Sequence, residues 1–182
     1  MTVPPLRFDE LAPELRRRLQ PKVDRLGYLG DFFAYAGHQP AALAAFIDFT
    51  ESLKAGLPFR VTEVVALTVA ARTRNTYERV QHERLALANG CDAAWVREVL
   101  ACRPDDHGSL RPEERGVQRL ALAALEGGGH GAGAPFAALV DLLGHEAAVG
   151  VLLTIGRYAA HALVANVLEL EAPVASPIEI DA

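Results

Sequence analysis

Cysteine is scarce in this sequence, because only Cys91 and Cys102 occur among 182 residues. Eleven positions separate them, which matches neither a metal-ligand spacing nor a redox spacing. We therefore interpret both as small buried hydrophobic side chains. A disulfide-stabilised secreted domain is not indicated, and a reducing cytoplasm is the expected location.

Long hydrophobic runs and clustered basic residues are also missing. The longest apolar runs, such as AAVGVLLTIG at 147–156, are shorter than the roughly 20 residues that span a bilayer. The N-terminal segment has no apolar core of the signal-peptide type. The formal net charge is −5, and the arginines do not gather on one predicted face. We expect a protein that binds neither membrane nor nucleic acid.

Strand patterns are absent as well, since no segment alternates apolar and polar residues with a period of two. Ala and Leu exceed Val and Ile, and aromatic residues make up 7% of the chain, which favours helices. We predict an all-α domain of about seven to eight helices. Proline and glycine delimit the predicted helices, which cover 10–20, 41–56, 58–73, 77–88, 93–101, 112–126, 135–144 and 145–170.

Three segments make up the predicted organisation. Residues 1–25 form an N-terminal extension, 26–172 form the helical domain and 173–182 form a loose, Pro-containing tail. The stretch 26–40 mixes aromatic residues with glycine and is expected to be irregular. An internal duplication is an open alternative, because Glu63 and Glu146 each precede or begin a strongly apolar helical segment.

Glu63, Glu78 and His82 form the strongest candidate site. Glu78 and His82 are four positions apart, so they face each other on one helix. Glu63 lies in the predicted helix 58–73, which is apolar nearly all round and should be buried. A buried carboxylate needs a partner, and a short RNT turn at 74–76 could bring His82 close to it. A purely structural polar cluster remains the alternative interpretation.

Other polar motifs carry weaker signals. His82-Glu83 and His145-Glu146 begin like a zinc-protease pattern, but the second histidine is missing, and no metal site is predicted. The stretch GGGHGAG at 127–133 is interpreted as a linker. His161, in an apolar helix, is interpreted as a core histidine. Tyr158 and Asn166 are polar, are predicted to share one buried face, and either pack helices or line a pocket.

The segment TEVVALTVAARTRNTYERVQHERLALANG at 62–90 resembles the carboxymuconolactone decarboxylase and alkylhydroperoxidase D-like family. GHQPAALAAF at 37–46 and IGRYAAHALVANVLEL at 155–170 are similar to other helices of that family, so the resemblance covers roughly 25–172. It implies an AhpD-like helical bundle and a homo-oligomer. The dimer, trimer and hexamer remain open.

The peroxidase branch of the family carries Glu-x11-Cys-x2-Cys-x3-His, in which two thiols reduce a peroxide. By this resemblance Glu63 and His82 fall on the Glu and the His, whereas Asn75 and Glu78 occupy the two cysteine positions. Thiol-based peroxide reduction needs a thiolate and a resolving partner. The missing thiols therefore count against a peroxidase, although Cys91 could act unconventionally.

The pair Tyr77-Glu78 resembles the decarboxylase branch instead. That resemblance implies a cofactor-free acid–base enzyme acting on a small carboxylated lactone or related acid. Glu63, Glu78 and His82 would be catalytic, with His82 handling the proton. The groups expected to bind substrate are Asn75, Tyr77, Tyr158 and Asn166. Two alternatives stay open, an alkylhydroperoxidase-like peroxidase and a non-catalytic oligomeric binding protein.

Overall fold

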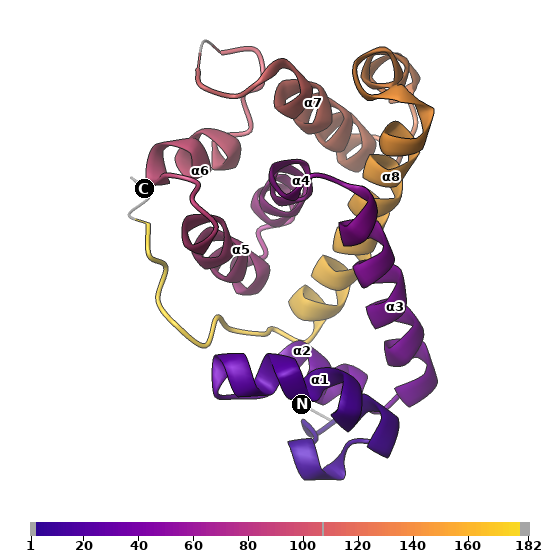
Figure 1. Cartoon of the computed structure of the whole chain (residues 1–182), viewed down its shortest axis with the longest axis vertical. Helices are drawn as coiled ribbons and strands as arrows, with labels where there is room; N and C mark the ends of the chain where they lie inside the picture. The colour runs from indigo at the N-terminus through magenta and orange to yellow at the C-terminus, as the bar shows by residue number, and fades with distance from the viewer. Residues whose placement is uncertain (1–2, 107, 179–182) are drawn as a thin grey trace. The chain divides into compact units, whose positions relative to one another are not determined.

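The computed structural model describes residues 3–106 and 108–178 of the chain. These residues form eight α-helices and one short 3₁₀-helix and contain no β-strand (Figure 1). The all-α prediction is therefore confirmed. The chain divides into two compact units, Met1–Ser52 and Leu53–Ala182. The predicted boundaries at 25/26 and 172/173 stay predictions.

The first unit consists of short helices and most of one longer helix. They are η1 (Phe8–Glu10), α1 (Pro13–Leu26), α2 (Asp31–Ala36) and α3 (Pro40–Gly56), the last of which continues into the second unit. The prediction that the first helix ends before Pro21 is wrong, because Pro21 lies inside α1. An interior proline weakens a helix locally, but it does not have to end one whose apolar side, here Leu15 and Leu19, is buried. The stretch 26–40, expected to be irregular, contains α2.

The second unit carries the remaining helices, which are α4 (Phe59–Arg72), α5 (Thr76–Ala88), α6 (Ala93–Leu100), α7 (Pro112–Glu126) and α8 (Gly133–Val167). Figure 1 shows α4 in the middle of this unit, and α5, α6, α7 and α8 all pack against it. Every residue from Val61 to Ala70 is buried. The apolar circumference of this helix thus makes it the centre of the hydrophobic core.

Helix α8 is two helices joined at a break. Gly144 has φ 80° and ψ 169°, a conformation that glycine adopts without steric cost. The break falls at the predicted boundary between the helices 135–144 and 145–170. Within the described residues, α8 is the one helix that is long and apolar enough to cross a membrane by length and composition alone. Its inner face nevertheless carries buried polar residues, Tyr158 and His161, as bundle helices do.

The C-terminal segment contacts the second unit at two residues. The Ser176 hydroxyl donates a hydrogen bond of 2.6 Å to Oε2 of Glu83, and Ile178 is buried in the hydrophobic core. Glu83 is fully buried, and its other oxygen lies 3.6 Å from Nη1 of Arg79. Ser176 is therefore bonded to α5, and Ile178 adds apolar packing against the core.

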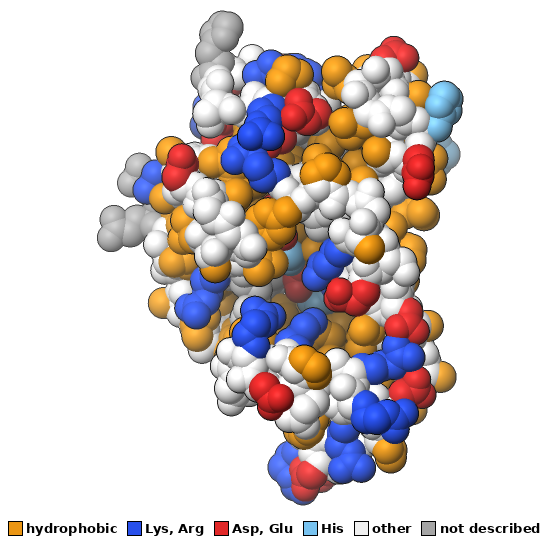
Figure 2. Space-filling view, in the orientation of Figure 1, with side chains coloured by type: hydrophobic (Ala, Val, Ile, Leu, Met, Phe, Trp, Pro, Cys, Tyr) orange, Lys and Arg blue, Asp and Glu red, His pale blue; other side chains and the backbone are white. Residues whose placement is uncertain are grey.

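Charged side chains of opposite sign are interleaved on the surface. On the face drawn in Figure 2, basic side chains stand beside acidic ones in each unit. No continuous basic stripe crosses either unit on that face. This distribution agrees with the small negative net charge of the chain.

Candidate active site

The hairpin of α4 and α5 brings Glu63 to His82. A three-residue turn, 73–75, joins the two helices, so they run antiparallel as neighbours. Nδ1 of His82 lies 2.8 Å from Oε2 of Glu63, and Glu63 is 1% exposed. The buried carboxylate in the apolar helix therefore has the imidazole as its hydrogen-bond partner, as its burial required.

Glu78 occupies the other side of the same ring. Its Oε2 lies 3.3 Å from Nε2 of His82, one helical turn away on α5. Both ring nitrogens of His82 thus face a carboxylate, one from α4 and one from α5. Two acceptors on one imidazole are satisfied together only when both nitrogens carry a proton.

Helix α8 adds cationic and aromatic groups to this pair. Nε2 of His161 lies 3.1 Å from Oε1 of Glu78, and Nη1 of Arg157 lies 3.8 Å from its Oε2. The Tyr158 ring meets the His82 ring edge-on at 5.1 Å between centroids, with the Arg157 guanidinium 4.2 Å from the Tyr158 centroid. Glu78 is therefore the point where α5 and α8 are joined electrostatically.

Sequence reasoning missed Arg157 and His161 as site residues. His161 was interpreted as a core histidine, and it is indeed buried, but its partner is the Glu78 carboxylate. The available signal was the spacing: Arg157 and His161 are four positions apart and hence share one face of an otherwise apolar helix. Only the tertiary structure shows which helix that face contacts.

The charges around His82 set its protonation. Burial by itself lowers the pKa of His82, but Glu63 and Glu78 outweigh it and raise the pKa to about 9. Burial raises the pKa of Glu78, but His161, His82 and Arg157 together hold it well below its usual range. At neutral pH the site therefore contains an imidazolium between carboxylates, which is a proton donor shielded from bulk water.

The residues predicted to bind substrate fall into two groups. Asn75, Tyr77 and Tyr158 are buried beside the charged cluster: Asn75 caps α5 by accepting the Glu78 N–H at 3.0 Å, and the Tyr77 ring stacks on that of His161. Asn166 is exposed, and its Nδ2 donates to the Thr73 carbonyl at 2.8 Å. The prediction that Asn166 is buried on the face of Tyr158 is wrong. Eight residues amount to about 2.2 helical turns, an offset of roughly 80°.

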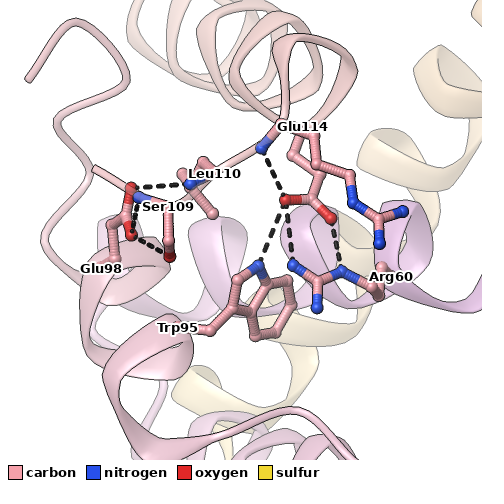
Figure 3. A network of polar contacts seen from close by, with 7 residues as sticks. Arg60, Trp95, Glu98, Ser109, Leu110 and Glu114 are labelled. Carbon is pink, nitrogen blue, oxygen red and sulfur yellow. Dashed lines mark hydrogen bonds and ion pairs between the residues drawn. The ribbon is translucent and has the colours of Figure 1, made fainter. Parts of the chain in front are cut away.

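Glu114 is a buried carboxylate outside the His82 cluster, and its hydrogen bonds link several helices (Figure 3). It accepts hydrogen bonds from Arg60 on α4, from Nε1 of Trp95 on α6 at 3.3 Å and from the Arg111 N–H at 3.0 Å. Nearby, Glu98 binds the backbone N–H groups of Ser109 and Leu110. Protein donors bind both carboxylates, which therefore hold α4, α6, α7 and residues 109–111 together.

Neither cysteine has the environment of a reactive thiol. Burial raises the pKa of Cys91, and the Glu63 carboxylate adds to that effect against the lowering by Arg60. Burial also raises the pKa of Cys102. Both side chains are free thiols. A raised pKa reduces the thiolate fraction that peroxide chemistry needs. Among the described residues, no group of three or more His, Cys, Asp and Glu side chains has a geometry that could hold a metal ion.

Known structures share this fold at low sequence identity. A peroxidase-related protein with an alkylhydroperoxidase AhpD core from Ralstonia eutropha JMP134 has a TM-score of 0.78 and 19% identity, over 90% of this chain and 87% of that one. ATU0492, a protein of unknown function from Agrobacterium tumefaciens, has a TM-score of 0.71 and 19% identity, over 78% of this chain and 97% of that one. A variant of the debrominase Bmp8 in complex with 2,3,4-tribromopyrrole has a TM-score of 0.74 and 18% identity, over 94% of this chain and 91% of that one.

These likenesses define an AhpD-like all-α fold. Residues 40–128, which contain α4 and α5 with Glu63, Glu78 and His82, match the model of the carboxymuconolactone decarboxylase family, in agreement with the resemblance seen in the sequence. No curated protein sequence matches the chain significantly. The match ends before α8, so it does not include Arg157, Tyr158 or His161.

Proposed function

We propose that this protein is a cofactor-free acid–base enzyme that decarboxylates a small carboxylated lactone or a related acid. The observation that carries the proposal is the His82 ring held between the Glu63 and Glu78 carboxylates, whose charges raise the pKa of the ring to about 9. A decarboxylase of this type has to deliver a proton to carbon and to hold negative charge near the reacting atoms. The imidazolium supplies the proton, and the Arg157 cation lies on the same cluster.

Decarboxylation at this site requires one bond cleavage and one proton transfer. The bond between the carboxylate carbon and its neighbour breaks, carbon dioxide leaves, and the electron pair stays on the substrate as a dienolate. The His82 imidazolium gives its proton to the substrate carbon and becomes neutral, and solvent protonates it again. Glu63 and Glu78 hold the ring orientation and favour its charged form. Tyr77, Tyr158 and Asn75 would bind substrate oxygens.

The test is turnover of a panel of carboxylated lactones and β-keto acids, followed as carbon dioxide release. We expect His82→Ala to lower kcat/KM at least about a hundredfold, the usual scale for loss of a general acid. His145→Ala, on an exposed position of α8, is the matched control and should retain wild-type rates. A fully active His82→Ala protein would refute the mechanism.

Two other functions predict different results. A non-catalytic oligomeric binding protein would turn over nothing on the panel, and His82→Ala and Glu63→Gln would change only the melting temperature. A peroxidase would consume an alkyl hydroperoxide with a thiol donor, and that activity would disappear in a Cys91→Ala, Cys102→Ala double variant. The raised pKa of both thiols disfavours the peroxidase.

A further inference from the structure

A pocket lined by arginines lies at the N-terminal end of α5. It has a volume of about 510 Å³ and is bounded by the end of α4, the turn that follows it, the first turn of α5, the end of α6 and the residue Arg103 beyond it. Four of its ten lining residues are arginines, namely Arg74, Arg79, Arg97 and Arg103, and no acidic residue lines it. The concave surface is thus strongly cationic in a chain whose net charge is negative.

Two of these cations lack a balancing anion. Arg79 lies 3.6 Å from the buried Glu83 carboxylate, and Arg103 lies 3.6 Å from Asp106. Arg74 and Arg97 form no ion pair within residues 3–106 and 108–178. The pocket therefore presents an excess of about two positive charges to whatever enters it.

The helix terminus in the pocket also offers N–H donors. Asn75 lines the pocket and is 2% exposed. Its carboxamide oxygen caps the Glu78 N–H, whereas its Nδ2 is buried and has no acceptor in the part of the chain that the structure describes. The first backbone N–H groups of a helix and its positive dipole end favour an anion at this position.

Arg74 occupies a backbone position that normally belongs to glycine. Its φ is 55°, and the Arg74 and Asn75 N–H groups bond the carbonyls of Ala71 and Ala70, the pattern of a Schellman helix end. A non-glycine residue is strained in this left-handed conformation, and such strain is frequent at ligand-binding positions. Arg74 therefore combines a strained backbone conformation with one of the two unbalanced positive charges in the pocket.

We propose that this pocket binds the phosphate group of a small molecule. A phosphate monoester carries nearly two negative charges at pH 7, which matches the excess charge of Arg74 and Arg97. Its oxygens accept paired hydrogen bonds from guanidinium groups and from a helix N-terminus. The inference goes beyond the proposed decarboxylation, because binding at this pocket requires no turnover at His82.

Calorimetric titration of the full chain tests the proposal at constant ionic strength with three probes: inorganic phosphate, glycerol 3-phosphate and succinate. We expect saturable, one-to-one binding of phosphate or glycerol 3-phosphate. Tighter binding of glycerol 3-phosphate identifies an organic phosphate as the ligand, whereas equal affinities identify the phosphate ion itself. The absence of saturable binding, or tighter binding of succinate, overturns the proposal.

Three variants separate charge from folding. Arg97→Gln removes one unbalanced cation, and we expect it to weaken binding at least fivefold. Arg74→Gly removes the other and relieves the left-handed strain, so the melting temperature should rise while binding weakens to a similar degree. Arg84→Gln, at an exposed position outside the pocket, should change affinity less than twofold. Unchanged binding in both pocket variants would overturn the proposal.

Discussion

His82 has a carboxylate on each ring nitrogen, Glu63 at Nδ1 and Glu78 at Nε2. His82 can therefore donate a proton from either ring nitrogen, and its positive charge balances the two buried carboxylates. Burial alone would favour the neutral ring, and only the two opposite charges reverse the outcome. The same two carboxylates would be unfavourable neighbours without the ring, so the three side chains depend on one another.

Stability should depend on pH through His82. Its folded-state pKa of about 9 lies above the ordinary 6.5, so its contribution is complete below about pH 6.5 and is lost as the pH rises through about 9. We expect the free energy of unfolding to fall by at most on the order of 3 kcal/mol over that range. Glu78 acts oppositely, because its lowered pKa contributes stability above about pH 4.5 that is lost in acid.

The measurement is urea unfolding of the wild type and of His82→Gln at intervals from pH 4.5 to 9.5. The difference between the two proteins isolates the titration of this ring from that of other groups. The fall in stability above pH 6.5 should be much smaller in the variant. Parallel curves for the two proteins would contradict the raised pKa.

At the scale of elements, the hairpin of α4 and α5 builds the site. Helix α4 is buried on all sides and places Glu63, and α5 begins at an Asn75 cap that sets the direction of Glu78 and His82. Arg157, Tyr158 and His161 of α8 then cover the charged cluster. The helices α4, α5 and α8 thus each contribute residues to the site, and the Asn75 cap sets the residue at which α5 begins.

Removal of the cap should destabilise the hairpin. Asn75→Ala deletes the acceptor for the Glu78 N–H, and we expect a loss of about 1 kcal/mol in the free energy of unfolding. Asn75→Ser keeps a capping oxygen and should lose clearly less. Both are compared by chemical denaturation at one pH. Equal losses in the two variants would show that the cap hydrogen bond is not the cause.

At the scale of the whole molecule, α8 presents an apolar face that one chain leaves exposed. Leu163 is 66% and Val167 is 72% exposed, and Val149, Leu152 and Leu153 are also exposed. Contiguous apolar side chains of this kind mark association surfaces. We propose that a second copy of the chain covers them, because homo-oligomers with closed symmetry are the commonest soluble assemblies.

A charge on this face should change the assembly. We expect Leu163→Glu to shift the mass in solution to that of a single chain, because a carboxylate in an apolar interface would be buried without a partner. Ala94→Glu, at an exposed position on α6, adds the same charge elsewhere and should leave the mass unchanged. Light scattering after size-exclusion chromatography measures both. A wild type of single-chain mass would contradict the proposed oligomer.

The sequence by itself determined the all-α fold, the break at Gly144 and the pairing of Glu63 with the Glu78 and His82 helix. These features follow from local rules: helical periodicity, glycine and proline at helix ends, and a turn too short to separate two helices. Pro21 shows the limit of such rules, because a proline weakens a helix without always ending it.

The tertiary structure alone decided what closes the site and what lines the arginine pocket. His161 and Arg157 are more than 70 positions from Glu78, and Arg97 and Arg74 come from different helices and turns. No periodicity reports which faces of two distant helices meet, since the helix pattern says only that a face is apolar or polar. Packing around α4 made that choice.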